Sequence, residues 1–188
     1  MKAGFMGTAL MAAALTVGAG VAGAADKQTA AVPESDAALA NNVRHEIVMY
    51  ADYSIWDDVN IDVSNGSVHL TGEVNQPIKK EEIDRLTRNL AGVTQVRNDI
   101  RVLPPSFEDD RLRLRIARAI YGDPALTQYA IQPLKPIHIL VENGHVTLAG
   151  VVNTEFDKQI AGTRAATAGM NFGPVVNNLQ VEHPAKKT

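Results

Sequence analysis

Arginine spacing in one short segment offers the clearest candidate for chemistry in this chain. Arg111, Arg115 and Arg118 follow the spacing i, i+4, i+7, which places them on one face of a helix, while Arg113 falls on another face. Guanidinium groups on such a stripe can dock to anionic phospholipid headgroups, where each basic residue adds about 1 kcal/mol. The alternative is a solvated helix face that pairs with the acids at 108–110. On the first interpretation, these three arginines are lipid-binding residues.

Histidines are the other candidate functional residues, but their positions give only weak support for a metal site. His69, His138 and His145 all lie on the outward phase of predicted strands, and His138 could face His145 across a hairpin. Two imidazoles without a third ligand make a weak metal site, and the chain has no cysteine. Its sequence also lacks the Gly-x-Ser-x-Gly, His-Glu-x-x-His and Gly-rich phosphate-loop signatures. We therefore predict that the protein is not an enzyme and has no catalytic residue, metal or cofactor.

The elements that position these side chains occur twice. Residues 59–75 and 137–153 share apolar strand positions and turn residues at a constant separation of 78 residues. In each copy, two alternating strands flank an Asn-Gly pair, which accepts the positive φ angles of a tight hairpin turn. The structural turn residues are therefore Asn65, Gly66, Asn143 and Gly144. We conclude that the chain is a tandem duplication.

Helices are predicted on either side of each hairpin. Asp36 and Asp109 can cap the opening helices, and a second helix and a third strand follow each hairpin. This order predicts an α+β fold of two αββαβ units, each a three-stranded sheet packed on two helices. Whether the third strand lies beside the first or the second stays open. The connection at 122–136 holds three prolines and is expected to lack regular structure.

One sheet face of the second copy is more apolar than its counterpart. A strand face that meets water should be polar, so apolar residues there indicate an interface. The replacements are Leu140 for Asp62, Ala149 for Thr71 and Val151 for Glu73. We expect Leu140, Ala149 and Val151 to be buried either against the first copy or against a client protein.

The start of the chain has the composition of a targeting segment. A positive charge at Lys2, an apolar stretch from Phe5 to Val21 and small residues before a cleavage point near Ala24 are typical of a secretory signal peptide. An uncleaved membrane anchor is the alternative. The formal net charge of -3 argues against a general nucleic-acid binder.

Together these patterns resemble the BON domain, a small module of bacterial envelope proteins. The resemblance rests on the opening helix with Asp36, Leu39, Val43 and Ile47, on the hairpins at 63–74 and 141–152, and on the segments 92–100 and 173–179. With a signal peptide and no cysteine for lipid attachment, the layout is similar to the soluble, osmotically inducible OsmY type of two-BON protein. We expect a signal peptide at 1–25, a disordered leader at 26–35, BON domains at 36–103 and 109–183, a linker at 104–108 and a flexible tail at 184–188.

The resemblance implies a non-enzymatic periplasmic protein that maintains the envelope under osmotic or related stress. It would act as a monomer, by association with a phospholipid membrane surface or, chaperone-like, with client envelope proteins. It would bind no nucleic acid and no small-molecule substrate. The alternative is a structural adaptor that bridges envelope proteins without lipid binding.

Overall fold

A computed structural model describes residues 35–168 and 174–182. The expected signal peptide at 1–25, almost all of the expected leader at 26–35 and the expected tail at 184–188 lie outside the described residues. No helix within the described ranges is long and apolar enough to cross a membrane.

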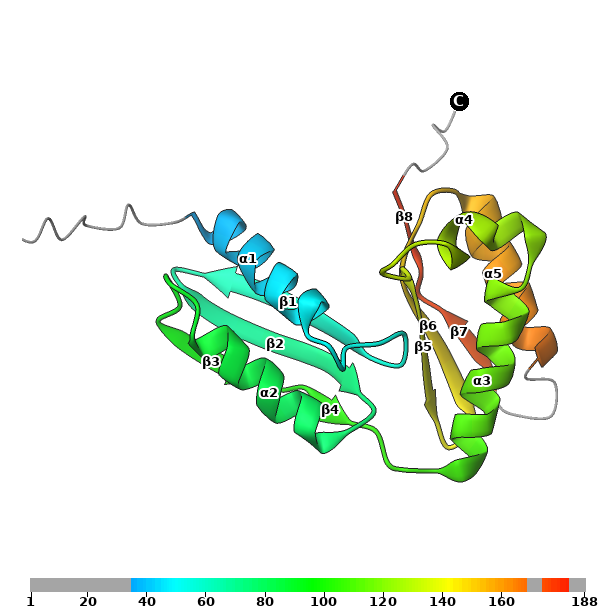
Figure 1. The fold of residues 1–188 in the computed structure, drawn as a ribbon, viewed down its shortest axis with the longest axis horizontal. Helices are drawn as coiled ribbons and strands as arrows, with labels where there is room; N and C mark the ends of the chain where they lie inside the picture. The colour runs from blue at the N-terminus through cyan, green and yellow to red at the C-terminus, as the bar shows by residue number, and fades with distance from the viewer. Residues whose placement is uncertain (1–34, 169–173, 183–188) are drawn as a thin grey trace, which may run out of the picture. The chain divides into compact units, whose positions relative to one another are not determined.

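The first copy is an αββαβ unit (Figure 1). Its elements are α1 (Asp36–Met49), β1 (Asp58–Ser64), β2 (Ser67–Val74), α2 (Pro77–Arg88), β3 (Gln95–Asn98) and β4 (Arg101–Val102). β1 pairs with β2 in antiparallel register, and β3 and β4 both run parallel to β2 on its other side. The third strand, broken into β3 and β4, therefore lies beside the second strand.

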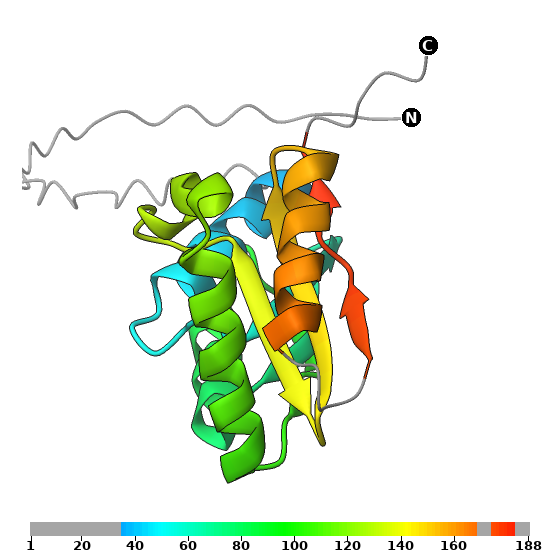
Figure 2. The ribbon, with the colours of Figure 1, turned by 90° about the vertical axis from the view of Figure 1, so that its right-hand side faces the viewer.

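The second copy repeats this order with a short insertion. Its elements are α3 (Phe107–Tyr121), the 3-10 helix η1 (Pro124–Leu126), α4 (Thr127–Ala130), β5 (Ile137–Glu142), β6 (His145–Val152), α5 (Glu155–Ala168), β7 (Val175–Asn177) and β8 (Gln180–Val181). Helices α3 and α5 lie side by side over one face of the sheet (Figure 2). β7 and β8 run parallel to β6, as β3 and β4 do to β2. The predicted α+β class with two αββαβ units is confirmed.

The connection between α3 and β5 corrects one expectation. We predicted that prolines would exclude regular structure there, but η1 and α4 occupy residues 124–130. Pro124 is the first residue of η1, where its missing N–H leaves no hydrogen bond unmade. Asp123 caps this turn by accepting from the Ala125 N–H at 2.8 Å. Proline breaks a helix only in its interior, and Pro133 and Pro136 follow the end of α4.

The two aspartates that were expected to cap the opening helices have another role. The N-caps are Ser35, which accepts from the Ala38 N–H, and Ser106. Asp36 instead accepts the backbone N–H groups of the first Asn-Gly turn at 2.8 and 3.0 Å. Asp109 does the same for the second turn at 2.9 and 2.8 Å. Each opening helix is thereby tied to its hairpin, whose Asn and Gly residues all take positive φ.

Each copy has a hydrophobic core between its helices and its sheet. In the first copy Leu39, Val43 and Ile47 of α1 are buried against the strands, and Ile83 of α2 joins them. In the second copy Leu112, Ile116 and Ile120 of α3 take the places of the α1 residues, and α5 contributes Ala161 and Ala165. The small α5 side chains fit a close approach, because a Cβ added at Gly162 would lie 2.6 Å from the Asn177 amide nitrogen.

Candidate functional site

The three predicted lipid-binding arginines share the solvent side of α3. Leu112, Ile116 and Ile120 are fully buried and fix which side of the helix faces the sheet. Arg111, Arg115 and Arg118 are exposed on the opposite side. At 3.6 residues per turn, these arginines fall within an arc of about 100° together with positions 107 and 114.

Two apolar side chains lie among these arginines, and the sequence analysis did not identify them. Phe107 is 74% exposed and Leu114 is 48% exposed. The Arg111 guanidinium lies 5.7 Å from the centroid of the Phe107 ring, within the range of a cation–π contact. The spacing of 107, 111, 114 and 118 could have revealed them, because it continues the arginine stripe. We call Phe107, Arg111, Leu114, Arg115 and Arg118 the outer face of α3.

The acids at 108–110 were the alternative explanation for the arginine stripe. Asp109 points inward to the hairpin turn, and Asp110 contacts Arg113, which is itself 4% exposed. Glu108 lies 3.7 Å from Arg111, and both side chains are 64% exposed. Surface pairs of this kind contribute about 0–1 kcal/mol. Pairing with Glu108 therefore contributes little at Arg111, whose guanidinium stays open to solvent.

The three histidines of the predicted strands lie in different surroundings. His69 lies 2.8 Å from Asp99, and this hydrogen bond, with the nearby Arg97, lowers the pKa of Asp99. His138 and His145 do not face each other, because the strand register pairs His138 with Ala149 and His145 with Glu142. Among the described residues, no three His, Cys, Asp or Glu side chains gather closely enough to hold a metal ion.

The apolar positions on the sheet of the second copy differ in exposure. Leu140 is 6% exposed and Ala149 is 7% exposed, whereas Val151 is 44% exposed. All three line a cleft that Tyr53 and Ile61 of the first copy also line. The Ile139 N–H of edge strand β5 donates to the Ile55 carbonyl, in the loop that follows α1, at 2.7 Å.

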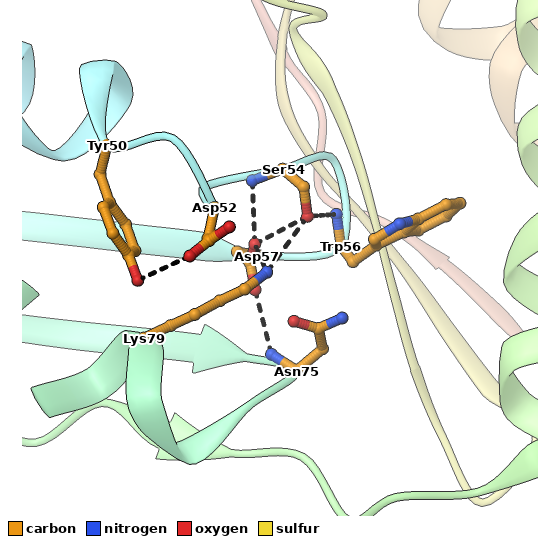
Figure 3. Close-up of polar contacts among 7 residues, drawn as sticks. All are labelled: Tyr50, Asp52, Ser54, Trp56, Asp57, Asn75 and Lys79. Carbon is orange, nitrogen blue, oxygen red and sulfur yellow. Dashed lines mark hydrogen bonds and ion pairs between the residues drawn. The ribbon is translucent and has the colours of Figure 1, made fainter. Parts of the chain in front are cut away.

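A buried ion pair lies between the β1 entry loop and α2 (Figure 3). The Asp57 side chain is fully buried, and Lys79 Nζ lies 2.7 Å from one of its oxygens. Asp57 also accepts from the Ser54 N–H and hydroxyl at 2.9 and 2.8 Å and from the Asn75 N–H at 3.0 Å. Because the carboxylate is fully engaged and closed to solvent, this arrangement fastens the loop to the helix rather than offering a reactive group.

The second copy makes the same connection with a different pair. The Tyr129 hydroxyl donates to Asp157 at 2.9 Å and accepts from the Asn153 N–H at 2.7 Å. Burial and the Asp157 carboxylate raise the pKa of Tyr129, so it remains a neutral donor. Asp157 stands 78 residues after Lys79. Sequence analysis missed both clusters, because the loop residues that complete them come from connections of unequal length.

One comparison with known proteins, that with protein-family models, agrees with the repeated unit. The family model for the BON domain matches residues 35–104 and 108–183. Among solved structures, the C-terminal domain of CdsD, a structural protein of the type III secretion system of Chlamydia trachomatis, is 16% identical with a TM-score of 0.29; the match covers 81% of this chain and 100% of that one. A second CdsD structure is 16% identical with a TM-score of 0.27, covering 77% and 94%. A search of curated proteins finds no match. The chain belongs to the BON-domain family and carries two BON domains in tandem.

Proposed function

We propose that this protein is a periplasmic envelope protein that associates with anionic phospholipid surfaces through the outer face of α3. BON domains are associated with phospholipid binding and with envelope proteins, and this association supports the choice of partner. The observation that carries the proposal is the mixture on that face of three arginines with exposed Phe107 and Leu114.

The composition of this face fits a headgroup layer better than it fits water. Three basic residues near an anionic surface together contribute about 3 kcal/mol, which is about a hundredfold in affinity. Phe107 and Leu114 add a smaller contribution from the apolar area that they bury at the membrane interface. The arginines provide attraction at long range, while the two apolar side chains require direct contact.

The first copy provides an internal comparison for this assignment. The opening helices align at an offset of 73 residues, as their buried residues show. At that offset α1 has Ala38, Asn41, Asn42 and His45 in place of Arg111, Leu114, Arg115 and Arg118. We therefore propose that membrane contact belongs to the second copy.

Sedimentation with liposomes tests the proposal. The triple variant Arg111→Gln, Arg115→Gln, Arg118→Gln should lose sedimentation with phosphatidylglycerol vesicles, and the wild-type protein should not sediment with phosphatidylcholine vesicles. The matched control neutralises three exposed arginines of the first copy at positions 85, 88 and 97, which changes the net charge equally. If the control variant loses sedimentation with phosphatidylglycerol vesicles and the α3 variant keeps it, the outer face of α3 is not the membrane-binding surface.

The cellular location and the kind of partner need separate measurements. Fractionation at low and high salt should show a membrane pool that salt releases, because exposed charges are screened over about 8–10 Å at physiological salt. Chaperone-like association with client proteins should appear as suppressed aggregation of an unfolded protein. A single protein partner that co-purifies one-to-one, without lipid binding, would instead favour a structural adaptor.

A further inference from the structure

A groove of about 580 Å³ lies apart from the outer face of α3, within the single compact unit that contains both copies. Its walls come from α1, from the loop that follows α1, from the proline-rich loop before β5, and from strands β5 and β6. This volume is in the range of about 300–1,000 Å³ that is typical of small-ligand sites. The groove is therefore large enough for a small ligand.

The lining of the groove is mainly apolar. Val48, Tyr53, Ile55, Leu134 and Val151 all contribute to its wall. Leu134 is 54% exposed and Val151 is 44% exposed, so the groove leaves apolar surface in contact with water. Burial of the Tyr53 hydroxyl raises its pKa, which keeps this side chain uncharged. An apolar chain that filled the groove would remove this surface from water.

The charges at the groove have one sign. Arg44 and Lys135 line it, and no Asp or Glu does, although the whole chain has a net charge of -3. Neither cation forms an ion pair with any residue in the described ranges, and the Arg44 side chain donates only to the neutral Asn41, at 3.3 Å. The His138 Nδ1 atom is buried with no hydrogen-bond partner in the described part of the chain. Arg44 and Lys135 would complement an anionic head. Acids appear only in the more polar cleft next to the groove, at Asp58 and Glu73.

We propose that this groove binds a single-chain anionic amphiphile, with its acyl chain along the apolar wall and its head against Arg44 and Lys135. A fatty acid carboxylate and a lysophospholipid phosphate share this chemistry. The inference does not rest on membrane docking by α3, because no residue of the outer face of α3 lines the groove.

Calorimetric titration of the full chain with palmitate and with lysophosphatidylglycerol, each below its micellar concentration, tests the proposal. We expect saturable one-to-one binding of at least one probe. The probe that binds more tightly shows whether the groove prefers a carboxylate or a phosphate head. Dodecyl maltoside, which has a chain and no charge, should bind at least tenfold more weakly. No saturable binding of either anionic probe, or equal binding of the maltoside, would overturn the proposal.

Variants locate the site and separate it from the α3 face. Val151→Trp should fill the groove and abolish binding, and Lys135→Gln should weaken it about tenfold. Both residues lie at the surface, and Leu134→Asp in the exposed loop is a second blocking variant if Val151→Trp does not fold. Arg97→Gln, a matched control at an exposed arginine outside both surfaces, should leave the titration unchanged, and the groove variants should leave liposome sedimentation unchanged. Undiminished binding in a folded blocking variant would contradict the site.

Discussion

Helices α1 and α3 occupy the same place in two copies of one fold, yet they present different surfaces to solvent. Their buried positions agree in spacing and in type, with Leu39 and Val43 of α1 matched by Leu112 and Ile116 of α3. Their outer faces do not agree, because α1 has Asn41 where α3 has the exposed Leu114. The duplicated unit therefore keeps the buried positions of its opening helix, while the exposed positions differ in charge and polarity between the two copies.

The largest effect is expected where the copies differ in the interior. Lys79→Met leaves the buried Asp57 carboxylate without its counter-ion and should destabilise the first copy by about 3–5 kcal/mol. Tyr129→Phe removes only a neutral hydroxyl from the second copy and should cost about 1–3 kcal/mol. Hydrogen exchange, followed separately in each copy, would measure the loss of stability in both variants. Lys80→Met is the control. Equal losses would show that the two clusters are energetically equivalent.

Transfer of the arginines to the first copy sharpens the comparison. In a chain whose α3 arginines are neutralised, the substitutions Ala38→Arg, Asn42→Arg and His45→Arg should restore binding to anionic vesicles. The affinity for anionic vesicles should recover by up to about a hundredfold, or about 3 kcal/mol. The recovery should be smaller than this because the first copy is more acidic and is repelled by the anionic surface. Vesicle sedimentation measures it. If binding stays absent in a folded graft, arginine spacing alone does not make the site, and Phe107 and Leu114 become essential to it.

The smallest expected effect concerns acid sensitivity in the first copy. The His69 hydrogen bond lowers the pKa of Asp99, so the native state gains stability above the unfolded pKa and loses it as pH falls through the lower folded value. His69→Gln should raise the pKa of Asp99 in an NMR titration and reduce this pH dependence. The equivalent position in the second copy is Asn178, which does not titrate. An unchanged Asp99 pKa would show that Arg97 alone supports the carboxylate.

Local patterns predicted most of the fold, because each depends on residues close together in the chain. Strand alternation and the Asn-Gly turns gave the hairpins, and the apolar spacing gave the helices. The role of Asp109 was missed because a side chain that could cap its own helix instead bonds a turn 34 residues away. Phe107 was missed because it precedes the predicted start of α3, and the Ser106 cap extends the helix to include it. Sequence spacing cannot rank such competing partners, because their distances arise only in the folded chain.

Site-specific labelling tests membrane docking by the outer face of α3 most directly. The chain has no cysteine, so Leu114→Cys and the matched Asn41→Cys each provide one attachment point for a nitroxide label. When phosphatidylglycerol vesicles are added, oxygen accessibility measured by electron paramagnetic resonance should rise at position 114 and stay unchanged at position 41. A label at 114 that remains in water while the protein is bound to vesicles would contradict the account.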